Sequence, residues 1–349
     1  MKGTTMERLA FLSCEKTSDA ATHTKTYLLR LPQCIATDEL KPGRYIVINH
    51  PDRFGTAQQR NYSITALRDN NQIEITVKST GNKGVSDSLY SNVSCGSLLC
   101  VSQVGGNITS DSIIAYRHVL MLAGGIGITL PVALIRSLVE LEKKDKTIPR
   151  VTLLVSSPTI ASIPFLAELL ALAFRSDWFN VRFFITREAV KTHSQHFTGG
   201  RLDKLSLLDS VPVDAAVICG SHGFSVAQQV LVKELNHNIP CYIEAFSSLE
   251  PSEPTAEHSP LTTVCARSNQ NDYRFQVSTG KTLLDALEAN QVPIRSQCRS
   301  GICGSCRIKV ISGACKRAPD FSLSTAERES GYALACCTYA EGGELSIEV

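Results

Sequence analysis

The first part of the chain contains short runs in which apolar and polar residues alternate. These runs predict strands at Thr24–Leu31, Tyr45–Asn49, Ile73–Lys78 and Leu98–Ser102. Alternation is typical of an antiparallel sheet with one buried face, and a barrel closes such a sheet without exposed edges. We therefore expect an antiparallel β-barrel over residues 1–110.

The second part of the chain has almost continuously apolar strands instead. They are expected at His118–Leu122, Val151–Val155, Val181–Ile185 and Ala215–Cys219, and helix-like stretches follow them. Strands that alternate with helices indicate a parallel sheet covered on both faces, which binds ligands at the carboxyl ends of its strands. We expect this α/β domain over residues 111–248.

The last part of the chain combines strand-like alternation of apolar and polar residues with one helix-like stretch. It predicts a strand at Tyr273–Val277, a helix at Thr282–Asn290, and strands at Arg307–Ile311 and Leu345–Val349. These elements indicate a small α+β domain.

A change of composition separates this domain from the one before it. Residues 249–264 include a stretch rich in Pro, Ser and Glu, which is typical of a polar linker. The third domain is then expected over residues 265–349.

Composition and charge narrow the class of protein. Lys plus Arg number 35 and Asp plus Glu 33, so the net charge of +2 favours neither nucleic acid nor an anionic membrane as a partner. The first residues lack the apolar core of a secretory signal, and we expect a cytoplasmic protein with no membrane partner. In a reducing compartment, 13 cysteines favour metal binding or redox chemistry over disulfides.

Four of these cysteines form the strongest motif. Cys298, Cys303 and Cys306 make a C-x4-C-x2-C run, and Cys336 follows in a separate segment. This is the plant-type [2Fe–2S] spacing, in which four thiolates hold two irons. A structural zinc site is the alternative, although such sites usually pair two C-x2-C motifs. Cys337 competes with Cys336 as the fourth ligand.

A glycine-rich turn joins the first strand of the α/β domain to a helix. It contains Gly124, Gly125, Gly127 and Thr129. Glycines let a pyrophosphate approach the backbone at a helix N-terminus, although a turn of this kind is often purely structural.

The expected barrel carries residue types that suit a flavin. An arginine can clamp a phosphate, a tyrosine can stack on a flat ring, and a serine hydroxyl can hydrogen-bond to a ring nitrogen. These residues are Arg60, Tyr62, Ser63, Gly84, Val85 and Ser86.

Together, these motifs resemble the ferredoxin–NADP reductase superfamily with an appended plant-type ferredoxin. The resemblance covers nearly the whole chain and implies a multidomain fold: an antiparallel β-barrel flavin domain, an α/β parallel-sheet nucleotide domain and a β-grasp ferredoxin domain. The chain departs from the family where Leu130 separates Thr129 from Pro131, and where Ser221 replaces a proline.

The resemblance also implies roles for matching positions. The flavin would be held by Arg60, Tyr62, Ser63, Lys78, Gly84, Val85 and Ser86. The nicotinamide nucleotide would be held by Gly124, Gly125, Gly127, Thr129, Cys219 and Gly220. Phe246 would lie near the flavin ring, and the catalytic positions would be Ser63, Cys219 and Glu244. The metal ligands would be Cys298, Cys303, Cys306 and Cys336.

The function implied is an iron–sulfur flavoprotein reductase, an NAD(P)H:acceptor oxidoreductase. Its cofactors would be FAD, with FMN as the alternative, and a [2Fe–2S] cluster. NADH is favoured over NADPH, although Arg187 could meet a 2′-phosphate. The acceptor would be a metalloprotein such as hybrid cluster protein, or alternatively an oxygenase or demethylase component. A non-catalytic iron–sulfur sensor is the alternative from another class.

Overall fold

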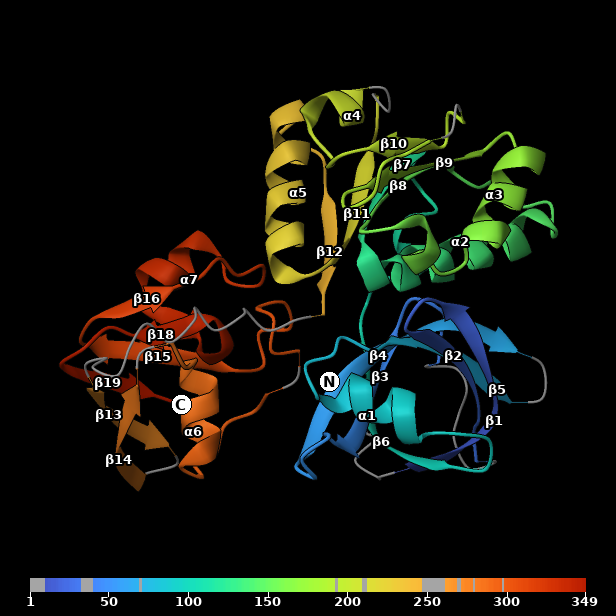
Figure 1. Cartoon of the computed structure of the whole chain (residues 1–349). Helices are drawn as coiled ribbons and strands as arrows, with labels where there is room; N and C mark the ends of the chain where they lie inside the picture. The colour runs from blue at the N-terminus through green and yellow to red at the C-terminus, as the bar shows by residue number, and fades with distance from the viewer. Residues whose placement is uncertain are drawn as a thin grey trace. The chain divides into compact units, whose positions relative to one another are not determined.

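The structure is a computed structural model that forms two compact units (Figure 1). It describes residues 10–32, 40–68, 71–191, 194–208, 212–246, 261–268, 271–278, 280–296 and 298–349. The first unit comprises Met1–Gly220 and Ala227–Glu244, and the second comprises Ser221–Val226 and Ala245–Val349.

The first unit begins with a closed antiparallel barrel, in the strand order β1-β2-β5-β4-β3-β6. Its strands are β1 (Ala10–Ala21), β2 (Thr24–Arg30), β3 (Tyr45–Pro51), β4 (Ala57–Arg68), β5 (Gln72–Lys78) and β6 (Leu98–Gly105). Alternate side chains of these strands, including Leu29, Ile46, Ile64 and Ile75, fill the interior. Helix α1 (Val85–Asn92) lies between β5 and β6 in the chain. The predicted barrel is confirmed, and β1 and β4 are additional strands.

The first unit continues with a six-stranded sheet, in the order β10-β9-β8-β7-β11-β12. Its strands are β7 (His118–Gly124), β8 (Arg150–Ser157), β9 (Phe179–Ile185), β10 (Phe197–Gly199), β11 (Ala215–Gly220) and β12 (Cys241–Ala245). The strands from β10 to β11 pair in parallel. Every residue of β11 is buried, as expected for a strand covered on both faces. The predicted parallel sheet is confirmed.

Helices connect these strands. The α-helices are α2 (Thr129–Glu142), α3 (Leu166–Arg175), α4 (Lys204–Leu208) and α5 (His222–Leu235). Three short 3-10 helices precede or follow strands: η2 (Ser110–Ser112), η3 (Gly125–Ile128) and η4 (Ile160–Ser162). The glycine-rich turn is therefore the 3-10 helix η3, which runs directly into α2.

The second unit contains a five-stranded sheet, in the order β14-β13-β19-β15-β17, and a two-stranded sheet of β16 and β18. These strands are β13 (Leu261–Ser268), β14 (Asn271–Ser278), β15 (Arg307–Ser312), β16 (Cys315–Arg317), β17 (Tyr332–Leu334), β18 (Thr338–Ala340) and β19 (Glu344–Glu348). The helices are α6 (Leu283–Ala289), α7 (Thr325–Glu329) and η5 (Ala335–Cys337). A mixed sheet with one helix packed on it is the expected β-grasp arrangement.

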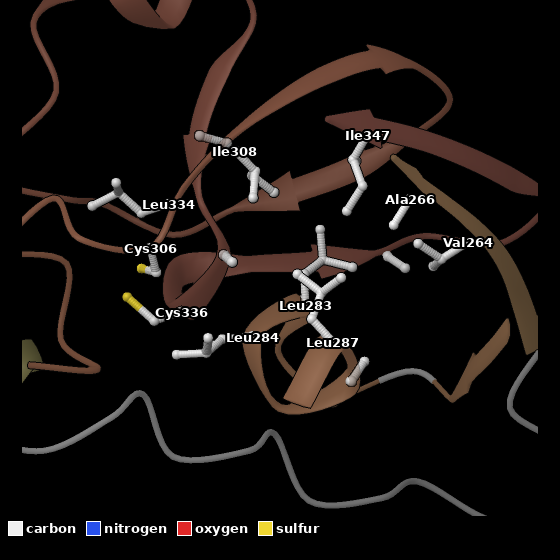
Figure 2. Packing of buried hydrophobic residues seen from close by; sticks show 14 of the residues in the cluster. Val264, Ala266, Leu283, Leu284, Leu287, Cys306, Ile308, Leu334, Cys336 and Ile347 are labelled. Carbon is white, nitrogen blue, oxygen red and sulfur yellow. The ribbon is translucent and has the colours of Figure 1, made fainter. Parts of the chain in front are cut away.

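Helix α6 covers one face of this sheet through its leucines. Leu283, Leu284 and Leu287 are buried with the strand residues Val264 and Ile347 in one core. Figure 2 shows the side chains of these α6 leucines in the core, with Cys306 and Cys336 at one end of it. The packing therefore fixes α6 beside the cysteine segment.

Most of the linker predicted at 249–264 lies outside the described residues. Strand β13 begins at Leu261, so the last four positions of that range form a strand, while the domain limits themselves stay predictions. Among the described helices, none is long and apolar enough to cross a membrane.

Candidate functional site

Two of the predicted flavin residues, Tyr62 and Ser86, are in contact. Tyr62 lies on β4, and its hydroxyl is 3.0 Å from the Oγ of Ser86 in the first turn of α1. Burial raises the pKa of Tyr62 to about 12, so the phenol stays neutral and can donate a hydrogen bond. The structure thus joins the Arg-x-Tyr-Ser segment to the Gly84–Ser86 turn, which lies far away in the sequence.

The turn before α1 is held by an aspartate that the sequence analysis did not single out. Oδ1 of buried Asp87 accepts hydrogen bonds from Ser79 Oγ at 2.7 Å, Thr80 N at 2.6 Å and Gly81 N at 3.0 Å. Burial disfavours the charge of Asp87, but these bonds outweigh it and lower its pKa. Gly84 is the N-cap residue of α1, and a Cβ there would contact no heavy atom within 4 Å. The Cβ position of Gly84 is therefore unobstructed by the described residues, and Asp87 is the acidic residue of the first turn.

Two cations lie close to each other at the rim of the first unit. Burial and the positive charge of Arg187 lower the pKa of Lys78. Lys78 ends barrel strand β5, and Arg187 follows strand β9 of the parallel sheet. The charge of Arg187 therefore acts on Lys78 although the two residues lie in different sheets of the first unit.

A buried carboxyl lies beside the predicted catalytic serine. Ser63 Oγ donates a hydrogen bond of 3.2 Å to Oε1 of Glu244, and both side chains are almost fully buried. Burial raises the pKa of Glu244 to about 8, although the bond from Ser63 opposes the shift. Burial, assisted by the nearby charge of Glu244, also raises the pKa of Cys219. The three predicted catalytic positions are therefore neighbours in a low-dielectric region.

The glycine turn also meets the end of strand β11. A Cβ on Gly127 would lie 2.2 Å from the carbonyl oxygen of Cys219 and 2.7 Å from the Cα of Gly220. Only glycine fits between η3 and this strand, so Gly127 has a packing reason to be there. Gly125 differs, because it has a φ of +55° and open space around it. Thr129 begins α2 and donates from Oγ1 to the Ile126 carbonyl at 3.1 Å.

The four predicted metal ligands form two pairs. Cys298 lies near Cys303, and Cys306 lies near Cys336, since within each pair one thiol perturbs the pKa of the other. Figure 2 shows the sulfurs of Cys306 and Cys336 facing each other. Within the described ranges, no three metal-binding side chains converge on one ion site. Four thiols gathered in one part of the second unit are the ligand set that a [2Fe–2S] cluster needs.

Backbone N–H groups surround the first pair. The amides of Ser300, Ile302 and Cys303 each donate to the sulfur of Cys298 at 3.4 Å. The amide of Ser305 donates to Cys303 Sγ at 3.5 Å. Such donors stabilise negative charge on thiolate sulfur and are typical of iron–sulfur sites. The residues present therefore fit a [2Fe–2S] cluster.

The structure distinguishes Cys336 from its neighbour Cys337. Their sulfurs are 3.7 Å apart, and both side chains are buried. The sulfur of Cys336 lies near that of Cys306, as Figure 2 shows, and the two thiols perturb each other's pKa. Cys337 lies under Gly301, where a Cβ would be 2.6 Å from its sulfur. This geometry favours Cys336 as the fourth ligand.

Phe246 is half-buried and belongs to the second unit, so its predicted place beside the flavin stays a prediction.

The predicted flavin residue Arg60 contacts its neighbours in the chain. Its guanidinium donates to the Gln59 carbonyl at 2.7 Å and to Gln58 Oε1 at 2.5 Å.

One charged cluster escaped the sequence analysis entirely. Arg136 of α2 donates to Glu74 Oε1 at 2.5 Å and bonds both carboxylate oxygens of Glu168 at 2.7 Å. Arg68 donates to the other oxygen of Glu74 at 2.9 Å. The cluster links the barrel to the helix that follows the glycine turn. Its members are far apart in the sequence and share no spacing, so no local signal could have revealed it.

Comparison with known proteins decides the nature of the second unit. Residues 266–341 match the 2Fe-2S iron-sulfur cluster binding domain family. This part of the chain is a [2Fe–2S] domain. It contains Cys298, Cys303, Cys306 and Cys336. The family match confirms the expected iron–sulfur cofactor. The individual ligands remain predictions.

Relatives extend over most of the chain. The chain is 29% identical over 273 residues to NADH oxidoreductase HCR of Escherichia coli (strain K12), covering 77% of each chain. It is 26% identical over 296 residues to phthalate dioxygenase reductase of Burkholderia cepacia, covering 83% of each. A solved structure of phthalate dioxygenase reductase superposes with a TM-score of 0.63 at 20% identity and covers 98% of both chains.

These comparisons confirm the predicted resemblance, the three-part fold and the oxidoreductase class of the [2Fe–2S] chain. The fold is the one expected to hold a flavin and a nicotinamide nucleotide. The relatives include reductases and reductase subunits of oxygenase systems, which supports an electron-accepting protein partner without identifying it.

Proposed function

We propose that this protein is an NADH-dependent reductase that passes electrons from a bound flavin through the [2Fe–2S] cluster to an external metalloprotein. The observation that carries the proposal is the set of N–H donors aimed at the sulfurs of Cys298 and Cys303, in a chain that also has the barrel and the parallel sheet. When bound, the flavin supplies the chemistry that accepts a hydride and releases single electrons. The chain positions the participants.

The cluster would be held by Cys298 and Cys303 on one iron and by Cys306 and Cys336 on the other. This assignment follows the two thiol pairs. The N–H groups around Cys298 would stabilise the more negative, reduced form, because each donor compensates charge on sulfur.

The flavin would be bound between β4 and α1. Tyr62 and Ser63 would contact the ring and its ribityl chain, and Arg60 and Lys78 would meet its phosphate side. The open N-terminus of α1 at Gly84, Val85 and Ser86 supports this orientation, because its amides can bind phosphate oxygens. FAD is proposed over FMN.

Ser63, Glu244 and Cys219 would surround the reacting rings. With a pKa of about 8, Glu244 still carries a proton at neutral pH, and Ser63 contacts its Oε1. This pair can hold a proton near the ring nitrogen that receives the hydride. Buried Cys219 would keep the nicotinamide side of the site dry.

The nicotinamide nucleotide would lie along Gly124, Gly125, Gly127 and Thr129, with Gly220 beside its ring. The open space at Gly125 supports a pyrophosphate there. NADH is proposed over NADPH. The closeness of Lys78 and Arg187 makes NADPH the comparison to run, because a 2′-phosphate would add two charges near that pair.

Hybrid cluster protein is the first proposed acceptor, on the relationship to the NADH oxidoreductase of Escherichia coli. An oxygenase component is the second, on the relationship to phthalate dioxygenase reductase. The test is anaerobic, NADH-driven reduction of each purified acceptor by the full-length protein. A clear preference for hybrid cluster protein supports the first choice. Equal, slow rates with every acceptor would remove it.

A non-catalytic iron–sulfur sensor is the remaining candidate. It differs in one observable respect, since a sensor would hold the cluster without accepting electrons from NADH.

A further inference from the structure

The cluster loop is tied to helix α6 by an ion-pair cluster that includes Arg299. The guanidinium of Arg299 donates to Asp285 Oδ1 at 2.9 Å and pairs with the carboxylate of Glu288. Glu288 also accepts a hydrogen bond of 2.7 Å from Ser296 Oγ. The residues on both sides of Cys298 are therefore anchored to the same helix.

Helix α6 is a firm support for these contacts. Its leucines are buried in the core of the second unit, and Thr282 caps its N-terminus by accepting from the amide of Asp285 at 3.1 Å. Asp285 and Glu288 are three residues apart, so they share one face of the helix. That face is different from the one that Leu284 and Leu287 bury.

The anchored residue has an unusual backbone. Arg299 has a φ of +56°, a left-handed conformation that costs a residue with a side chain about 1 kcal/mol or more. This turn brings the next amide, Ser300 N, back to Cys298 Sγ, and the amides of Ile302 and Cys303 follow. Glycine adopts this conformation more readily, but only the arginine side chain supplies the contacts with Asp285 and Glu288.

We propose that Asp285 and Glu288, acting through Arg299, are positioning residues that keep the N–H donors of the cluster loop on Cys298 and so raise the reduction potential of the cluster. This inference rests on the proposed function, because it assumes that Cys298 ligates iron. Hydrogen bonds to sulfur favour the reduced cluster, and loosening the turn weakens them. The reduction potential would then depend on three side chains that are not predicted ligands.

Two variants separate positioning from simple electrostatics. Arg299→Lys keeps the charge but cannot reproduce the forked geometry that reaches two carboxylates. If only the charge at position 299 mattered, the reduction potential of the cluster would not change. If the contacts of Arg299 position the loop, the reduction potential falls. Glu288→Gln removes a negative charge, so electrostatics alone predicts a higher potential, whereas positioning again predicts a lower one.

Arg267→Lys is the matched control. Arg267 pairs with Asp272 at 2.8 Å on the β13–β14 hairpin, which supplies no proposed ligand. The same substitution there should leave the potential unchanged.

The measurement is a mediated redox titration of the purified full-length protein, followed by the cluster's EPR signal. We expect both test variants to lower the potential, by up to about a tenfold change in the reduction equilibrium constant, or about 59 mV for one electron. An unchanged potential in Arg299→Lys, or a higher one in Glu288→Gln, would overturn the inference.

If either variant fails to retain a cluster, Asp285→Asn replaces it, because that change leaves the Glu288–Arg299 pair in place. A smaller shift to lower potential is expected there, and no shift or a rise counts against the inference. A wild-type protein without a [2Fe–2S] signal would instead contradict the proposed function itself.

Discussion

At the residue scale, Gly127 occupies a position where even one methyl group is too large. A Cβ would lie 2.2 Å from the Cys219 carbonyl oxygen, and that atom belongs to a central strand that cannot move freely. We expect Gly127→Ala to lower the free energy of unfolding of the first unit by about 2–3 kcal/mol. Chemical denaturation followed by fluorescence measures this change.

Gly84→Ala is its control, since a Cβ at Gly84 would contact nothing within 4 Å and its φ of −77° is ordinary. The control should cost less than about 1 kcal/mol. Equal losses in the two variants would show that the contact with β11 is not what requires glycine.

Glu244 should make stability depend on pH. Its pKa is about 8 in the folded protein against an ordinary value of 4.5, so between these values the folded state binds the extra proton. The contribution of Glu244 to the free energy of unfolding therefore falls as the pH rises from 4.5 to 8, by at most about 1.4 kcal/mol per pH unit. Denaturant titrations across this range should show a shallower loss in Glu244→Gln. Parallel curves for the two proteins would contradict a buried, protonated Glu244.

The adjacent cysteines should respond differently to substitution. Cys336→Ser removes a thiol that pairs with Cys306, so we expect most of the [2Fe–2S] absorbance to be lost. Cys337→Ser should retain the [2Fe–2S] absorbance. The sulfur of Cys337 lies 3.7 Å from that of Cys336 and packs against Gly301. Iron and sulfide analysis of both purified variants is the measurement. The reverse result would make Cys337 the ligand.

The sequence was informative at this scale where chemistry fixes the spacing. Cys298, Cys303, Cys306 and Cys336 could be selected because a loop must deliver three thiolates together. Gly127 was expected to accommodate a pyrophosphate, yet the structure shows a contact with β11 that no local pattern reveals. Tertiary neighbours of this kind cannot be derived from one segment.

At the element scale, the Arg136 cluster should hold the barrel against helix α2, which packs on strand β4 (Figure 1). Glu74 of the barrel is mostly buried. Arg136→Met would leave the negative charge of Glu74 without the cation that helix α2 supplies. We expect a loss of about 3 kcal/mol, measured as a lower unfolding midpoint by calorimetry.

Glu168→Gln tests the same arginine from its exposed side. Glu168 is 45% exposed, and its pair with Arg136 should contribute less than about 1 kcal/mol. If the two variants lose the same stability, the contact between barrel and helix has no special role.

Strongly periodic elements were predicted well. The apolar strands around β7, β8, β9 and β11 were expected within a few residues, because burial on both faces leaves an unbroken apolar run. Strands β1 and β4 were missed. Each is 12 residues long and carries many polar side chains, so barrel pairing rather than local preference determines them.

At the scale of the whole molecule, the order of the three folds was predictable because each has its own period and motif. The limits between them rest on composition alone and stay predictions, and β13 begins at Leu261, inside the range expected for the linker. The near-neutral charge leaves the choice of acceptor to local surfaces, which a single sequence does not describe.

The central claim is that electrons from NADH pass through a flavin to the cluster. Its most direct test is an anaerobic titration of the purified full-length protein with NADH. The absorbance of the flavin and of the cluster is recorded at each step, together with the EPR signal of the reduced cluster. The account predicts that the flavin band bleaches and that a reduced [2Fe–2S] signal appears with it. Bleaching of the flavin with no reduced-cluster signal, or no bleaching at all, would contradict the account.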